Sequence, residues 1–219
     1  MSLIQIIVLA VVQGITEFLP ISSSGHLVLV PEFFGWGDQG LAFDVAVHFG
    51  SLIAVLIFFR TDIAGLVRGG LTVLGGRVDT IESRLAAGIA LGTIPAAVAG
   101  LLAAGWIEAN LRSPNVIVFT LSGYAVLMLL ADRFGRRTLG ISDVRIRDAF
   151  LIGVAQALAL IPGTSRSGVT ITAAMALGFE RQDAARFSFL LAVPVILLAT
   201  GYELTKLLAG AAPVPWAEL

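Results

Sequence analysis

Two stretches of this chain share a set of residues that can do chemistry. Residues 13–26 read QGITEFLPISSSGH and residues 156–168 read QALALIPGTSRSG, and their Gln, Ser and Gly positions match at one constant spacing. The first copy also carries Glu17 and His26, and the second carries Arg166. Ionisable groups are costly inside segments apolar enough to enter a bilayer, so we interpret these residues as candidates for a functional site.

The hydroxyl groups of both copies follow closely on a Pro, where a new helix is predicted to begin. Ser and Thr are good helix N-caps, and a helix N-terminus presents free N–H groups and the positive end of its dipole. Two such N-termini together with Arg166 predict an anion site, and the planar guanidinium suits phosphate oxygens. The hydroxyl residues concerned are Ser22, Ser23, Ser24, Thr164, Ser165 and Ser167.

The acid of the first copy needs its own explanation. Glu17 would repel phosphate unless it is protonated, paired with Arg166 or bound to a divalent cation. Mg²⁺ and Ca²⁺ prefer oxygen ligands and bridge to phosphate, so a cation reconciles the acid with the anion. His26 can give or take a proton near neutral pH, and Ser23 becomes a nucleophile if a neighbouring base activates it.

Composition indicates where these residues must act. Hydrophobic residues make up 57% of the 219 residues and charged residues only 13%, about half the share of a soluble domain. The chain is therefore predicted to be an integral membrane protein. A formal net charge of −1 argues against nucleic acid as a partner, and the chain has no Cys. The N-terminus lacks the basic region and cleavage site of a signal peptide, so we expect its first helix to be retained.

The apolar segments are of two kinds. Four of them are near the ~20 residues of a membrane-spanning helix, namely residues 43–59, 85–106, 116–131 and 187–204. The two matching stretches are instead interrupted, so that residues 3–19 resume at 27–34 and residues 149–161 resume at 169–177. Irregular backbone at membrane depth is tolerated where protein or a cavity surrounds it, so both are predicted to be re-entrant helical hairpins.

Basic residues between these segments predict the topology. Segment 31–42 has none, 60–84 has four, 107–114 has one and 132–148 has five, which alternates as the positive-inside rule requires. Arg181 and Arg186 fall on the basic side only if the second hairpin is re-entrant. The predicted fold is a single all-α transmembrane domain over residues 1–219. It contains inverted repeats, about 1–131 and 148–219, whose hairpin tips meet near the bilayer midplane.

The two stretches carry a resemblance to a known family. The first resembles the [E/Q]xxxE-plus-SSxGH motif of the undecaprenyl-pyrophosphate phosphatases, also called the bacitracin-resistance family, and PGTSRSGVT at 162–170 resembles its PGxSRSxxT motif. Residues 43–45 and 187–194 also look like family sequence. The resemblance implies removal of the terminal phosphate of undecaprenyl pyrophosphate with a divalent cation. It also implies a bacterial plasma membrane, a site open to the periplasmic face and a role in recycling the lipid carrier of cell-wall synthesis.

The resemblance also implies residue roles. Gln13 and Glu17 are the implied metal and acid–base pair, Ser23 and His26 lie beside the phosphate that is cleaved, and Arg166 clamps the pyrophosphate. Gly25 belongs to the first motif, and Ser165 and Thr170 support the substrate. The attacking group is either Ser23 or His26, and we favour Ser23.

Two features depart from the family pattern. Gln13 replaces an acid that many relatives carry, so one metal ligand would be a neutral amide oxygen. Family members usually continue through two more transmembrane helices after the position of Leu219, so the second repeat is expected to be incomplete. Either the chain is a truncated form, or a second subunit supplies those helices. A homodimer is a separate expectation.

Several alternatives remain open from the sequence. A secondary transporter or flippase of a phosphate-bearing lipid or anion would use the same inverted repeats and midplane site. The acid-phosphatase-like lipid phosphatases share fragments of these motifs, but their KxxxxxxRP element is missing. The Glu17–Arg166 pair has a purely structural alternative, and so do the small-residue clusters. For His48 the alternatives are a side chain that faces the cavity and a hydrogen-bonded structural residue, and the second is favoured. Asp44 is interpreted as a helix-capping acid.

Overall fold

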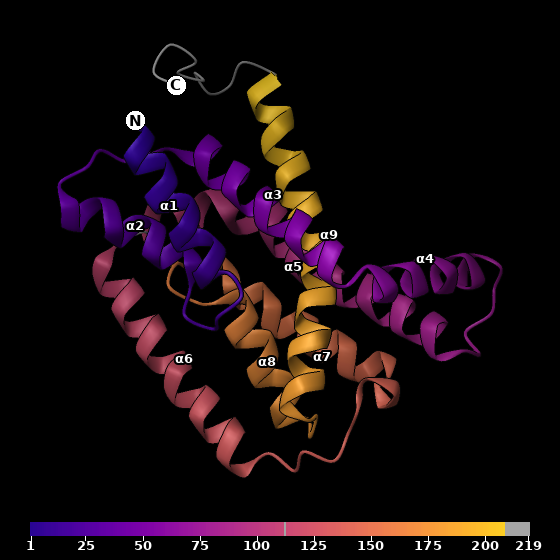
Figure 1. Cartoon of the computed structure of the whole chain (residues 1–219). Helices are drawn as coiled ribbons and strands as arrows, with labels where there is room; N and C mark the ends of the chain where they lie inside the picture. The colour runs from indigo at the N-terminus through magenta and orange to yellow at the C-terminus, as the bar shows by residue number, and fades with distance from the viewer. Residues whose placement is uncertain (112, 209–219) are drawn as a thin grey trace.

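The chain folds into helices, which confirms the predicted all-α class. The computed structural model describes residues 1–111 and 113–208, and within them the β-type pairing is one isolated bridge between Leu139 and Phe179. The α-helices are α1 (Leu3–Thr16), α2 (Ser23–Phe34), α3 (Leu41–Phe58), α4 (Arg60–Leu74), α5 (Ile81–Leu111), α6 (Pro114–Phe134), α7 (Ile146–Ala157), α8 (Arg166–Ala176) and α9 (Arg181–Leu208) (Figure 1).

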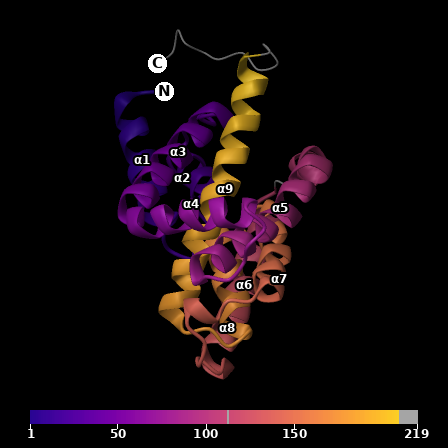
Figure 2. The same ribbon diagram turned by 90° about the vertical axis from the view of Figure 1, so that its right-hand side faces the viewer.

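Several helices are long and apolar enough to cross a membrane. Among the described residues these are Ile81–Ala103 of α5, Asn115–Phe134 of α6 and Arg181–Tyr202 of α9. They cover three of the four expected spans. Helix α9 runs the length of the molecule, as the second view shows (Figure 2). Helices of this length and hydropathy are those of a multi-pass membrane protein.

The remaining expected span, residues 43–59, continues further than predicted. Helix α3 turns by 85° into α4, and only the two helices together are long and apolar enough to cross a membrane. The hydropathy of residues 60–84 predicts a connecting segment, but Arg60–Leu74 is a helix. Ile63 and Leu66 of α4 pack against the core, while the Arg68 side chain is exposed. An amphipathic helix of this kind has too few apolar residues to be recognised as a span.

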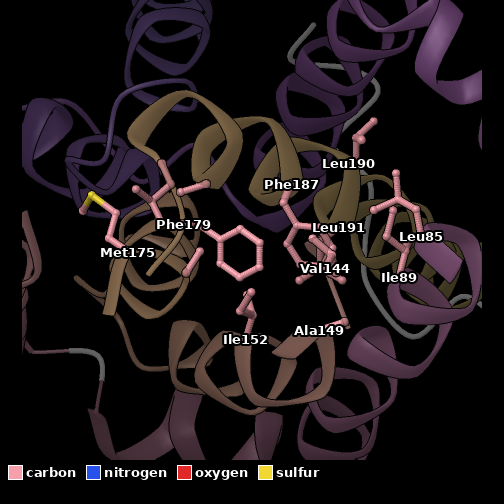
Figure 3. Packing of buried hydrophobic residues seen from close by; sticks show 13 residues of the cluster. Leu85, Ile89, Val144, Ala149, Ile152, Met175, Phe179, Phe187, Leu190 and Leu191 are labelled. Atoms are coloured by element: carbon pink, nitrogen blue, oxygen red, sulfur yellow. The ribbon is translucent and has the colours of Figure 1, made fainter. Parts of the chain in front are cut away.

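The main core lies where α5, α7, α8 and α9 meet. Phe179 and Phe187 are almost fully buried there, against Ile152 of α7 and Leu190 and Leu191 of α9 (Figure 3). Helices α5 and α7 approach closely because each has a glycine where they cross. A Cβ on Gly153 would lie 2.1 Å from the carbonyl oxygen of Gly92. Small residues permit such close helix packing in membranes.

Each of the two matching stretches forms a helical hairpin. Helix α1 packs against α2, and α7 packs against α8. A Pro ring clashes with the carbonyl group four residues earlier, which explains both helix ends. Pro20 lies four residues after Thr16, the last residue of α1, and Pro162 lies four residues after Leu158, where α7 gives way to a short 3₁₀ turn (Leu158–Leu160). The loops of the two hairpins face each other in the middle of the molecule (Figure 1).

Candidate functional site

Both helices that follow the breaks begin at a serine N-cap, as the sequence predicts. The Ser22 hydroxyl accepts a hydrogen bond of 3.4 Å from the backbone N–H of Gly25. The Ser165 hydroxyl accepts the matching bond of 3.1 Å from Gly168. The N-termini of α2 and α8 therefore have the same capping hydrogen bond. Ser22 has a φ of 64°, a left-handed conformation that is uncommon outside Gly, Asn and Asp.

An ion pair joins the two hairpin loops. The guanidinium of Arg166 donates a hydrogen bond through its NH2 group to Oε1 of Glu17, and both side chains are largely shielded from solvent, with exposed fractions of 18% and 6%. Ser167 adds a weaker contact of 3.4 Å to the carbonyl oxygen of Leu19. The structure thus brings together the acid of one copy and the cation of the other, which are far apart in sequence.

The second carboxylate oxygen of Glu17 is the centre of a small hydrogen-bond network. Ser23 donates its hydroxyl proton to Oε2 over 2.6 Å, and the amide nitrogen of Gln13 donates to the same oxygen over 3.1 Å. Gln13 is fully buried, and its own amide oxygen has no hydrogen-bond partner in the described part of the chain. The short Ser23 contact means that the carboxylate is in position to accept the serine proton.

His48 belongs to the same network, although the sequence favours a structural role for it. Its Nδ1 lies 2.6 Å from the backbone oxygen of Asp44, which can only accept, so Nδ1 carries a proton. Its Nε2 points toward Glu17 and lies 3.6 Å from Oε2. A histidine on an apolar helix gives no local signal of such a contact. The motif around it, FDVAVH, is the one available hint.

A cavity of about 410 Å³ opens between the two hairpins and helices α3, α5 and α9. It is lined by most of the predicted site residues, namely Glu17, Ser22, Ser23, Ser24, Thr164, Ser165, Arg166 and Ser167. His48, Asp44 and Gln156 also line it, beside apolar groups such as Ala96 and Leu160. Within residues 1–111 and 113–208, the buried NH1 group of Arg166 has no hydrogen-bond partner. That group is available to an anionic ligand.

Four predicted residues lie around this cavity without lining it: Gln13, Gly25, His26 and Thr170. His26 is half-buried, and its Nδ1 lies 2.8 Å from the backbone oxygen of Ser22, so Nδ1 is protonated and Nε2 can accept a proton. The Thr170 hydroxyl is buried and lies 2.6 Å from that of Ser188 on α9. These contacts hold the hairpins in place.

The donor set is sparse for a divalent cation. Within the described residues no group of three or more His, Asp or Glu side chains is arranged to hold a metal ion. Glu17 lines the cavity, and the Gln13 amide oxygen has no partner. Mg²⁺ is commonly bound by one or two carboxylates together with substrate phosphates. The residues present therefore fit a cation that is shared with a phosphate ligand.

Fold and site together define a helical membrane protein with a polar cavity, built from two broken hairpins that contribute an acid, a hydroxyl group and an arginine. The chain belongs to the family described as bacitracin resistance protein BacA, whose pattern matches residues 6–216. It is 53% identical over its whole length to the undecaprenyl-diphosphatase 2 of Stutzerimonas stutzeri, covering 82% of that protein. It is 56% identical, over 94% of its length, to the undecaprenyl-diphosphatase of Thioalkalivibrio sulfidiphilus, covering 78% of that relative.

Proposed function

We propose that the protein hydrolyses undecaprenyl pyrophosphate to undecaprenyl monophosphate and inorganic phosphate, which recycles the lipid carrier of cell-wall synthesis. The observation that carries this proposal is the Ser23 hydroxyl, which donates to a Glu17 carboxylate that is also paired with Arg166. The names of the relatives point to the same reaction. Transport would require only anion binding, so it gives no reason for a hydroxyl group held against a base.

The contacts suggest how the bond is cleaved. Glu17 accepts the proton of Ser23 while the serine oxygen attacks the terminal phosphorus, and the bond from that phosphorus to the bridging oxygen breaks. Undecaprenyl monophosphate leaves, and water then releases the phosphate from serine. Ser23 is favoured over His26 because it contacts Glu17 and lines the cavity, whereas the Nδ1 of His26 is bonded to the hairpin turn.

Charge neutralisation contributes most in this proposal. Phosphoryl transfer depends mainly on positioning and on electrostatic stabilisation. The free NH1 group of Arg166 would bind the terminal phosphate, supported by the N-termini of α2 and α8. A divalent cation, Mg²⁺ or Ca²⁺, would neutralise phosphate charge when bound beside Glu17, with Gln13 next to it. His26 is proposed to exchange protons during the second step.

The proposed topology has two re-entrant hairpins of opposite orientation. It is supported by contacts of the segment that follows α8. Arg181 forms an ion pair with Asp132 at the end of α6, and Arg186 forms one with Asp62 of α4. If the second hairpin crossed the membrane fully, the two arginines would lie on the opposite side of the membrane from the two aspartates. The basic side would then face the cytoplasm and the site would open to the outer face of the bacterial plasma membrane.

The test is phosphate release from undecaprenyl pyrophosphate by the purified protein in detergent, with and without EDTA. We expect release that EDTA suppresses and that added Mg²⁺ or Ca²⁺ restores. Release that is unaffected by EDTA would refute the cation, and no release in the presence of either cation would refute the phosphatase proposal. Homodimer formation remains a prediction that the molar mass of the solubilised protein would test.

A further inference from the structure

One polar side chain in the cavity has no assigned role and no partner. Gln156 of α7 is 1% exposed, and neither its amide nitrogen nor its amide oxygen has a hydrogen-bond partner among the residues that the structure describes. It lines the same cavity as Glu17 and Arg166. Leaving an amide unpaired at such a depth is costly, so its presence calls for a ligand.

The matching residue of the first hairpin explains why Gln156 is unpaired. Gln13 donates its amide nitrogen to Glu17 over 3.1 Å. The position that corresponds to Glu17 in the second hairpin is Leu160, whose side chain cannot accept a hydrogen bond. The second hairpin has thus kept the amide without its acid. The Gln156 nitrogen is left with no protein acceptor and with no carboxylate beside it in its own hairpin that would repel an anion.

The surroundings of Gln156 indicate which part of a ligand it meets. Ala159 and Leu160, which follow Gln156 closely in the chain, line the cavity with apolar groups, whereas Ser23 and Glu17 come from the opposite hairpin. A lipid pyrophosphate has its reacting phosphate at one end and its apolar chain at the other. The apolar wall suits the first part of that chain, so Gln156 suits the phosphate next to it.

We propose that Gln156 is a substrate-binding residue whose amide nitrogen donates a hydrogen bond to the phosphate that stays on the lipid. This inference rests on the proposed function and extends it. The first hairpin and Arg166 act on the terminal phosphate, while Gln156 holds the lipid-proximal one. A hydrogen bond to an anionic oxygen is stronger than one between neutral groups, and it satisfies the buried amide nitrogen.

The decisive variant is Gln156→Met, which keeps the length of the side chain and removes both polar atoms. The probe is undecaprenyl monophosphate, which retains the lipid-proximal phosphate, and its affinity is measured by the rise it causes in the melting temperature of the detergent-solubilised protein. We expect about tenfold weaker binding, which corresponds to ~1.4 kcal/mol, and a similar rise in KM for undecaprenyl pyrophosphate. Competitive inhibition by inorganic phosphate should not change.

The melting temperature of the unliganded variant separates binding from structure. If the amide has no protein partner, its removal should leave this temperature unchanged or raise it. Thr172→Val is the control, because the Thr172 hydroxyl of α8 is also buried and unpartnered but does not line the cavity. This variant should leave the affinity for undecaprenyl monophosphate and the KM for undecaprenyl pyrophosphate unchanged. Gln156→Leu repeats the test with a second apolar side chain.

The outcomes are distinct. Unchanged binding of undecaprenyl monophosphate to Gln156→Met and Gln156→Leu would overturn the inference, and so would weaker inhibition by inorganic phosphate alone, which would assign Gln156 to the terminal phosphate. A fall in melting temperature without ligand would overturn it as well, in favour of a structural role. Because the main measurement is of binding, a parent protein that binds the monophosphate but releases no phosphate would refute only the proposed hydrolysis.

Discussion

At the scale of single residues, Glu17 controls the geometry of the site. Its two carboxylate oxygens contact Arg166, Ser23, Gln13 and His48. The carboxylate therefore fixes the serine that is proposed to attack and the arginine that is proposed to bind phosphate. Removing either charge of the pair leaves the other one buried without its partner, which is costly in a membrane.

Glu17→Ala and Arg166→Ala are expected to abolish turnover, with a loss of at least about a hundredfold to a thousandfold, as is typical when a group that stabilises transition-state charge is removed. Phosphate release from undecaprenyl pyrophosphate is the measurement, and elution as a single monodisperse peak in detergent is the control for folding. Near-parental release by either variant would contradict the role proposed for that residue.

His48 gives a milder prediction, because it acts through Glu17. His48→Ala removes the Nε2 group that lies 3.6 Å from the carboxylate and should lower kcat about tenfold with little change in KM, since the residue positions the base rather than the substrate. Ser51→Ala is a matched control on the same helix, because this buried hydroxyl bonds to the carbonyl oxygen of Val47 outside the cavity. If both variants lowered kcat equally, His48 would have no specific role in positioning Glu17.

The residues of the site differ in how far sequence can predict them. Glu17, Ser23 and Arg166 are predictable as one site because the matching hairpins set them at corresponding breaks, and a break in an apolar segment is a local signal. His48 and Gln156 lie within helices. Polar residues inside helices are as common at structural positions as at functional ones. Their approach to the cavity depends on how α3 packs against the first hairpin and how α7 packs against α5 and α8, and a single sequence does not carry that information.

At the scale of elements, the two breaks follow local rules and are predictable for that reason. Pro20 and Pro162 end the preceding helices, and serine N-caps start the next ones. The 85° bend between α3 and α4 has no such local signal, because neither Pro nor Gly marks it and the two helices adjoin at Phe59. Tertiary packing of the apolar face of α4 decides its direction there.

The turn before α8 gives an element-scale prediction. Gly163 has a φ of +85°, and a Cβ there would lie 2.3 Å from the hydroxyl of Thr120 and 2.7 Å from the carbonyl oxygen of Ile117, both on α6. Gly163→Ala should therefore displace the turn that carries Arg166. We expect a melting temperature lower by several degrees, consistent with a loss of about 2 kcal/mol, and at least about tenfold slower phosphate release.

Gly35→Ala separates backbone strain from the contact with α6. Gly35 also has a positive φ, of +64°, but a Cβ added there would have no atom within 4 Å. This variant should therefore show the strain alone, with a small change in melting temperature and parental activity. Similar activity losses in the two variants would mean that the fit of the second hairpin against α6 is not what positions Arg166.

At the scale of the whole molecule, the packing around α9 links the hairpin site to the surface. Arg181 and Arg186 at the start of α9 form ion pairs with Asp132 and Asp62, which come from α6 and α4. The backbone N–H groups of Thr138 and Leu139 also donate to the carbonyl oxygen of Gly178 in the turn before α9. These contacts join three basic segments on one side of the protein.

That arrangement predicts a membrane topology that can be tested by cysteine labelling. Because the chain has no Cys, a single introduced cysteine would be its only thiol group. Each of the three basic segments has an exposed position for a cysteine, as in Val78→Cys, Thr138→Cys and Gln182→Cys. These three variants should react with a membrane-impermeant thiol reagent from the same side of the membrane. Gly37→Cys, in the segment without basic residues, should react from the opposite side of oriented vesicles. If Gln182→Cys were labelled from the same side as Gly37→Cys, the second hairpin would cross the membrane. The inverted-repeat topology would then be wrong.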